Sequence, residues 1–211
     1  MINRNFFFER SRSKIFGNKL TNKQVQGLNY ILDAWENGHT AWDDRWLAYA
    51  LGTTHLETGA AMQPIHEKGG KNYFEAHYGA SGLNSKRANS MGNTQPGDGA
   101  KFHGRGFVQL TWQVNYRSMS KHLTQKYGMQ IDLLSDPDLA LQPDYAAEIM
   151  FYGMYSGAFT GKKFIDYFSK NSSGSIQKDN WNGARAIING TDKAEIVANF
   201  SRDYYSCISY A

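Results

Sequence analysis

The sequence predicts a mainly α-helical domain that spans residues 1–211 and contains one loop-rich lobe. The length is close to that of a single domain. Apolar residues recur at helical spacing along most of the chain. The region 59–106 is instead interrupted by glycines, and so long a loop-rich stretch usually lines a functional site. We therefore expect a lobe at about 59–112 inserted in the helical body, a cleft between lobe and body, and at most a small β element.

Each expected helix has a start signal, a stop signal or an apolar period. Thr21 and Gln24 form a capping box for a helix that ends at Gly38. A second helix begins near residues 43–44 and runs to about residue 58. Further helices are expected at about 113–127, 143–157, 162–169 and 179–188, and a last one starts at Asp192 with Glu195 as its capping-box partner.

The segment 107–112 has the alternation of a β-strand. Val108, Leu110 and Trp112 would lie on one face, and Gln109 and Thr111 on the other. We therefore expect a short strand here, followed directly by the helix at 113–127.

Composition excludes several classes of protein. The net charge of +4 favours anionic surfaces but is too small to indicate nucleic acid. The single cysteine, Cys207, excludes an internal disulfide and an all-cysteine zinc site. No apolar run reaches the ~18 residues of a membrane span, and the N-terminus does not resemble a secretory signal. We expect synthesis in a reducing cytoplasm.

Two glutamates are candidates for acid–base chemistry. Glu57 falls on the apolar stripe of the helix at 43–58, so it is either ion-paired or partly desolvated, and desolvation would suit a general acid. Glu67 lies ten residues later, where the chain can turn and bring one carboxylate to face the other. Two facing carboxylates are the minimum for glycoside hydrolysis. The alternatives are a structural ion pair at Glu57 and a surface charge at Glu67.

Three polar side chains follow in the block 102–116. Gln109, Thr111 and Asn115 could hold a water molecule or sugar hydroxyls. The alternative is that they satisfy nearby backbone groups.

In their order and combination these segments resemble family 19 glycoside hydrolases, and among those the phage endolysin branch. The matching segments are His55-x-Glu57-Thr-Gly59, Met62–Ile65 with Glu67, Gly104–Trp112 through Asn115-Tyr116, and Ile187–Gly190. The sequence departs from the family at Leu56, which stands between His55 and Glu57 where the family has its histidine next to the acid.

The resemblance implies a lysozyme-like α-helical fold and an inverting mechanism without metal or cofactor. Glu57 matches the general acid, Glu67 the general base, and Thr111 the hydroxyl residue that positions water. Gln109, Asn115 and Asn189 match substrate-contacting positions, and Tyr116 is expected to line the groove. Arg202 is a candidate for the family's C-terminal basic residue.

The resemblance thus implies an endolysin that cleaves the β-1,4 bond between N-acetylmuramic acid and N-acetylglucosamine in peptidoglycan. We expect a monomeric protein with a single catalytic domain and no separate wall-binding domain. It would be stored in the host bacterial cytoplasm and released by a holin-type membrane partner. It would then act on the cell wall in the periplasm, attracted to the anionic envelope surface.

Three alternatives remain from the residues. A chitinase would use the same catalytic groups on β-1,4-N-acetylglucosamine polymers. A zinc-dependent cell-wall amidase or peptidase would draw its ligands from His55, Glu57, His66, His77 and His103. A carbohydrate-binding module without catalysis would account for the 14% aromatic content.

Overall fold

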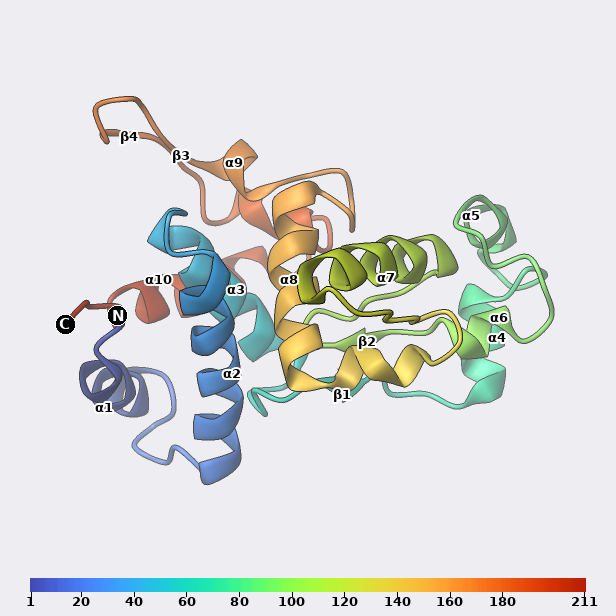
Figure 1. The fold of residues 1–211 in the computed structure, drawn as a ribbon, viewed down its shortest axis with the longest axis horizontal. Coiled ribbons are helices and arrows are strands. Elements are labelled where there is room, and N and C mark those ends of the chain that lie inside the picture. Colours follow the sequence, from blue (N-terminus) through green and yellow to red (C-terminus); the bar gives the residue numbers. More distant parts are fainter. The chain divides into compact units, whose positions relative to one another are not determined.

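The computed structural model describes residues 1–211 and divides them into two compact units. Unit 1 contains residues 1–63 and 150–211, and unit 2 contains residues 64–149 (Figure 1). The predicted mainly α-helical fold is confirmed, with strands limited to two small sheets. No helix combines the length and the apolar character that crossing a membrane requires.

Unit 1 is a helical body. It consists of α1 (Arg4–Lys14), α2 (Asn22–Gly38), α3 (Asp44–Glu57), the last residues of α8 (Pro143–Ser156), α9 (Phe164–Tyr167), β3 (Phe168–Lys170), β4 (Ile176–Asp179), a 3-10 helix η2 (Gly183–Ile187) and α10 (Ala194–Tyr205). The predicted capping box is confirmed, because the Thr21 hydroxyl accepts from the Gln24 amide and the Gln24 side chain accepts from the Thr21 amide.

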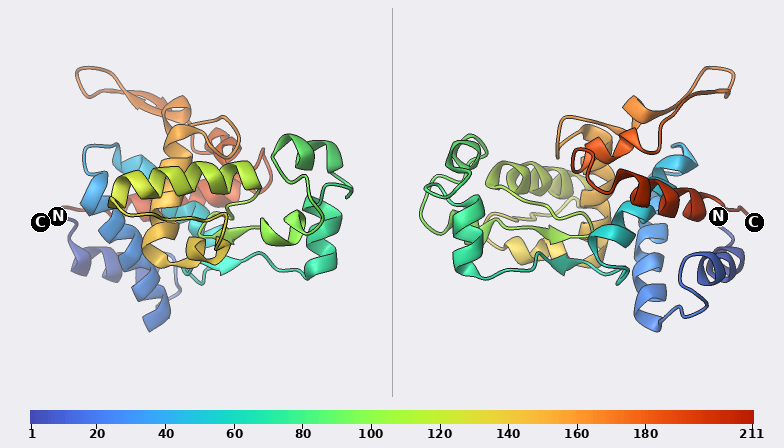
Figure 2. Two further views of the ribbon diagram at one scale, coloured as in Figure 1. Left: turned by 45° about the vertical axis from the view of Figure 1, so that its right-hand side comes forward. Right: turned by 180° about the vertical axis from the view of Figure 1, so that it is seen from behind.

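Helix α3 is the centre of unit 1. Every residue from Arg45 to His55 is buried. Helix α10 packs closely along it (Figure 2), and Gly52 permits this contact, since a Cβ at that position would lie 2.1 Å from the Ser201 hydroxyl oxygen. The close packing of α10 holds the end of α3, and thus Glu57, in a fixed position.

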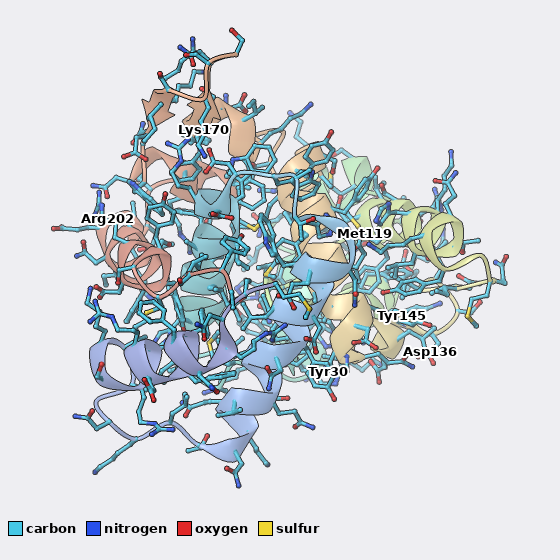
Figure 3. All side chains as sticks on the ribbon, turned by 60° about the vertical axis from the view of Figure 1, so that its left-hand side comes forward. Tyr30, Met119, Asp136, Tyr145, Lys170 and Arg202 are labelled. Atoms are coloured by element: carbon cyan, nitrogen blue, oxygen red, sulfur yellow. The ribbon has the colours of Figure 1, made fainter.

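A hairpin of β3 and β4 is attached to the start of α3. The buried Arg45 guanidinium donates to the carbonyl oxygens of Lys178 and Ser169 at 2.7 and 3.2 Å, and pairs with Asp43 and Asp179. The hairpin carries Lys170, labelled in Figure 3. The buried arginine therefore bonds to both strands of the hairpin, of which β4 is exposed and β3 is buried at Phe168 and Ser169.

Unit 2 contains the loop-rich region. Its elements are β1 (Ile65–His66), α4 (Lys71–Tyr78), α5 (Ser85–Ser90), α6 (Asp98–Lys101), β2 (Arg105–Gly106), α7 (Gln113–Tyr127), a 3-10 helix η1 (Pro137–Leu141) and the first half of α8. Strands β1 and β2 pair antiparallel, with Ile65 opposite Gly106 and His66 opposite Arg105. This unit extends beyond the lobe expected at 59–112, because α7 and part of α8 belong to it.

The predicted strand at 107–112 is wrong. The chain forms a tight loop, in which Arg105 and Leu110 exchange backbone hydrogen bonds of 3.1 and 2.7 Å. Gln109 and Trp112 have positive φ angles of 61° and 78°, outside the strand region. The apolar residues Val108, Leu110 and Trp112 alternate because the loop buries their side chains. Gln109 and Thr111 do not form the face of a strand.

The predicted C-terminal elements need three corrections. Residues 162–169 contain only the four-residue α9 before β3 begins, and the helix expected at 179–188 is the shorter 3-10 helix η2. The last helix begins at Ala194 rather than Asp192. Lys193, in a left-handed conformation, stands at its N-cap without a side-chain hydrogen bond, so Glu195 has no capping-box role.

Aromatic side chains account for many of the largest buried groups. Trp35, Tyr49 and Phe7 are fully buried in unit 1, and Phe102 and Phe107 in unit 2. The two cores therefore bury 14 of the 30 aromatic side chains.

Candidate active site

The Glu57 carboxylate lies in unit 1, at the C-terminal end of α3, and forms an ion pair. Arg185 of η2 donates from Nη1 to Glu57 Oε1 at 2.6 Å. The arginine side chain is 3% exposed, and its Nε donates to the Asp192 carbonyl oxygen at 2.9 Å. The sequence left open whether Glu57 is ion-paired or unpaired and partly desolvated, and in the structure it is ion-paired. A guanidinium held in place by a second bond fixes the Glu57 carboxylate and stabilises its negative charge.

Sequence reasoning missed Arg185, which lies 128 residues from Glu57. The available signal was a single arginine between Ala184 and the apolar pair Ala186 and Ile187, because a cation within an apolar run is rarely buried without a partner.

The candidate basic residue, Arg202, has other partners. It lies exposed on α10 (Figure 3), donates to Asn199 Oδ1 at 3.2 Å, and places its guanidinium 5.9 Å from the centre of the Trp181 ring. The cation paired with Glu57 is therefore Arg185 rather than Arg202.

Asn189 is connected to the same arginine. Its backbone N–H donates to the Arg185 carbonyl oxygen at 2.9 Å, and its side chain is exposed. The Asn189 side-chain amide is thus accessible, and its backbone is bonded to Arg185, the partner of Glu57. Its predicted role in substrate contact stays a prediction.

His55 faces the core of unit 1. Its ring contacts Phe200 and Phe16, with ring centres 4.1 and 5.2 Å apart, and its Nδ1 lies 3.1 Å from the Tyr204 hydroxyl. Burial lowers the pKa of His55 to about 4. His55 is therefore a neutral packing residue.

The Glu67 carboxylate lies in unit 2 and is held at both oxygens. Tyr78 donates its hydroxyl to Oε1 at 2.7 Å, and the Gly104 amide donates to Oε2 at 3.2 Å. The Glu67 backbone N–H donates in turn to the Gly104 carbonyl oxygen at 2.8 Å. Burial, together with the bond to Glu67, raises the pKa of Tyr78 above its ordinary value, so the phenol keeps its proton and remains a donor.

Gly104 is required by the space around this carboxylate. A Cβ at position 104 would lie 2.7 Å from Gln109 Oε1 and 3.0 Å from Glu67 Oε2. The Gln109 amide nitrogen points to the carbonyl oxygens of Ile65 and Gly106, each at 3.4 Å. Gln109 Oε1 is buried and accepts no hydrogen bond from the protein. An acceptor of this kind beside a carboxylate fits a hydroxyl donor supplied by a ligand.

Thr111 and Asn115 lie after this loop. The Thr111 hydroxyl donates to the Gln109 carbonyl oxygen at 3.0 Å, which leaves its lone pairs to accept from a water molecule. Asn115 is buried and donates to the Thr111 carbonyl oxygen at 2.9 Å. In unit 2 the structure therefore brings Glu67 and Gln109 together, with Thr111 bonded to Gln109 and Asn115 to Thr111.

The expectation that Tyr116 lines a groove is wrong. Tyr116 is fully buried, donates its hydroxyl to the His103 carbonyl oxygen at 2.7 Å, and accepts from Arg105 at 2.9 Å. Arg105 also pairs with Asp138 at 2.7 Å. Tyr116 and Arg105 thus both donate to the His103 carbonyl oxygen, next to Gly104.

Two histidines stand beside Glu67. His66 Nδ1 and His103 Nε2 are 3.2 Å apart, and His103 Nδ1 lies 2.6 Å from the Ala100 carbonyl oxygen. Burial lowers the pKa of His103. Because a carbonyl oxygen can only accept, His103 Nδ1 carries the proton and donates to Ala100. His103 Nε2 is therefore an acceptor, and His66 Nδ1 donates to it.

The zinc alternative has no ligand cluster in the structure. His55 is buried in unit 1, and His77 Nδ1 lies 2.9 Å from the Tyr73 carbonyl oxygen. No three His, Cys, Asp or Glu side chains come together in an arrangement able to hold a metal ion.

Comparison with known proteins gives matches in structure only. No protein-family model and no curated protein matches the chain. A chitinase C with a glutamate-to-glutamine substitution superposes with a TM-score of 0.55 at 17% identity, over 98% of this chain and 91% of that chain. Chitinase C from Streptomyces griseus gives 0.55 at 19% identity, over 97% and 75%. A bacterial family 19 chitinase gives 0.48 at 18% identity, over 96% and 94%.

These low identities make the likeness one of fold. The two chitinase C structures are matched over nearly the whole of this chain. The chain therefore has the lysozyme-like, mainly α-helical fold of chitinase C.

Proposed function

We propose that the protein is a glycoside hydrolase that cleaves β-1,4-linked N-acetylated glycans, and that its substrate is peptidoglycan, cut between N-acetylmuramic acid and N-acetylglucosamine. The observation that carries the proposal is the Glu67 carboxylate, held at both oxygens beside the unpartnered Gln109 acceptor. The fold shared with chitinase C and the motifs shared with family 19 hydrolases support it.

The proposed mechanism assigns different tasks to the two carboxylates. Glu57 protonates the leaving glycosidic oxygen, and the Arg185 guanidinium stabilises the resulting carboxylate. Glu67 accepts a proton from the attacking water, and its bonds to Tyr78 and Gly104 fix the oxygen that does so. An inverting reaction requires the two carboxylates to be separated by ~6.5–9.5 Å, which leaves room for that water.

The remaining polar groups orient the reactants. Thr111 accepts a hydrogen bond from the water, and Gln109 Oε1 accepts from a sugar hydroxyl or amide. Asn115 keeps the Thr111 backbone in place, and the exposed Asn189 amide contacts the sugar on the Glu57 side.

Digestion of purified peptidoglycan followed by mass spectrometry tests the proposal. We expect new reducing ends at N-acetylmuramic acid, and loss of activity by more than about 1,000-fold in both Glu57→Gln and Glu67→Gln. Glu195→Gln is the matched control, because this exposed glutamate has no catalytic assignment. Activity retained within about tenfold in either catalytic variant would refute that assignment, and released peptides without new reducing ends would indicate an amidase.

Chitin is the second candidate substrate, because the solved structures that share the fold are named chitinases. Both polymers present β-1,4-linked N-acetylated sugars, so the same carboxylates would serve either. Parallel digestion of chitin oligosaccharides separates the two: faster turnover of chitin than of peptidoglycan would favour the chitinase.

We further propose that the protein acts as an endolysin. It would be held as a monomer in the host cytoplasm and would reach the cell wall after a holin-type partner permeabilises the membrane. The motif resemblance and the basic net charge support this role. Expression in a bacterial host with a membrane-permeabilising protein should cause lysis, whereas expression alone should not.

A further inference from the structure

The excess positive charge of this protein is concentrated at its N-terminus. Residues 1–23 contain six lysines or arginines and one glutamate, a net charge of +5. The whole chain has a net charge of +4, so residues 24–211 together carry −1. The attraction to anionic partners suggested by the overall charge must therefore originate mainly from this short segment.

Four of the six cations are free to meet a partner. We define the N-terminal basic patch as the four exposed side chains of α1, the following loop and the start of α2 that form no ion pair: Arg10, Arg12, Lys19 and Lys23. Arg4 is excluded because Asp33 and Glu36 neutralise it, and Lys14 because it lies 3.4 Å from Asp203.

The patch is built on a fixed backbone. The Asn3 amide donates to the Ser209 carbonyl oxygen at 2.8 Å, and the Asn3 side chain caps α1. Phe7 and Ser11 bury one side of α1, and Asn18 donates to the Arg12 carbonyl oxygen at 2.9 Å. Figure 1 shows the two chain ends side by side near α1, and the loop from α1 running to the start of α2. The four charges are therefore displayed on an ordered surface.

The chemistry of the patch favours a polymer over a lipid bilayer. Insertion into a membrane surface requires an exposed apolar stripe along the helix. On α1, Phe7 is fully buried, and Phe6 is 37% exposed with the Arg10 guanidinium 5.9 Å from its ring centre. Electrostatic attraction remains, and Arg10 and Arg12, two residues apart on α1, lie on different sides of the helix, where a flexible chain of negative charges can reach both more readily than a flat bilayer.

We propose that the N-terminal basic patch, which contains none of the hydrolytic residues, binds an anionic envelope polymer of the poly(glycerol phosphate) kind. The polyanion chemistry follows from the patch itself, whereas the choice of an envelope polymer rests on the proposed function. Binding there would retain the protein on its substrate between cleavage events, and would lower its rate of dissociation from intact wall.

The test is binding of the full chain to immobilised poly(glycerol phosphate), which contains no cleavable glycan. For a flexible polyanion, the logarithm of the binding constant falls with the logarithm of the salt concentration with a slope of about −0.7 per neutralised phosphate. Four contacts therefore predict about a 50-fold loss of affinity between about 50 and 200 mM salt. A patch variant with all four residues changed to glutamine should bind at least about tenfold more weakly at the lower salt concentration, with a flatter salt dependence.

A matched control variant removes the same amount of charge elsewhere. It changes four exposed lysines that form no ion pair: Lys86, Lys121, Lys162 and Lys178, each to glutamine. We expect this variant to bind within about threefold of the unmodified protein. Equal loss of affinity in both variants would overturn the proposal, since only net charge would then matter.

A second arm measures binding to phosphatidylglycerol vesicles. Binding to vesicles as strong as to the polymer would overturn the choice of a polymer. Digestion of glycan oligosaccharides by both variants separates this proposal from the proposed function: the patch variant should hydrolyse them normally, and an inactive but polymer-binding protein would refute only the hydrolase.

Discussion

The buried His55 predicts a loss of stability in mild acid. Its ring lies between Phe200 and Phe16, at centre distances of 4.1 and 5.2 Å, and is 6% exposed. The ordinary pKa of histidine is 6.5, and burial lowers it here to about 4. Between these two pH values the unfolded chain binds a proton at His55 that the folded chain does not, so the free energy of unfolding must fall as the pH falls.

The magnitude follows from the two pKa values. Their difference of about 2.5 corresponds to about 3 kcal/mol in the free energy of unfolding. The destabilisation begins below pH 6.5 and is complete near pH 4. A loss of this size is a large part of the roughly 5–15 kcal/mol that stabilises a typical domain.

Urea unfolding at about pH 7 and about pH 4.5 measures this contribution. Replacing His55 with glutamine removes the titrating group, so we expect the variant to lose about 2 kcal/mol less stability than the unmodified protein over this interval. His77→Gln is the control, because the His77 side chain is half-buried and lies outside the core of unit 1. It should leave the pH dependence unchanged.

One result would refute the reasoning. If His55→Gln and the unmodified protein lose equal stability between the two pH values, the folded protein must accommodate a charged imidazole at position 55. The nearby Tyr204 hydroxyl, 3.1 Å from Nδ1, would then be accepting a hydrogen bond from the imidazolium.

Three further predictions concern the two carboxylates and the hairpin. Gly104→Ala should lower kcat by about 100-fold with little change in melting temperature, because its Cβ would press on Gln109 Oε1 and Glu67 Oε2 and displace both side chains. A normal kcat would show that these contacts relax freely. Arg185→Gln removes the guanidinium that holds the Glu57 carboxylate, so it should lower kcat by about 10- to 100-fold with a smaller change in KM. A change confined to KM would instead indicate a role in binding. Arg45→Met should reduce the free energy of unfolding in urea by about 3–5 kcal/mol, because it leaves the largely buried Asp43 with only Lys170, at 3.9 Å, as a charged partner. A loss below about 1 kcal/mol would show that the hairpin does not depend on this arginine.

Elements with local signals were predictable. The helix Asn22–Gly38 begins with a capping box whose two hydrogen bonds join residues three apart, so its start could be read directly from Thr21 and Gln24. Helix α7 at Gln113–Tyr127 and helix α8 at Pro143–Ser156 also matched their expected bounds within one residue.

Elements that depend on distant contacts were not predictable. The hairpin β3–β4 follows from Arg45, which bonds to residues more than 120 positions away. The alternation at 107–112 looked like a strand, because burial of apolar residues in a tight loop gives the same pattern.

For the candidate site, the motif resemblance singled out Glu57, Glu67, Gln109 and Thr111, whereas the residue types alone also allowed an ion pair, a surface charge and bonds to nearby backbone. The sequence by itself also determined the mainly helical fold and the charge at the N-terminus. Only tertiary structure decided that Arg185 pairs with Glu57 and that Gly104 leaves space for Glu67. The physical reason is range: caps and helical periods act over a few residues, whereas ion pairs and close backbone contacts arise only where packing has joined remote parts of the chain.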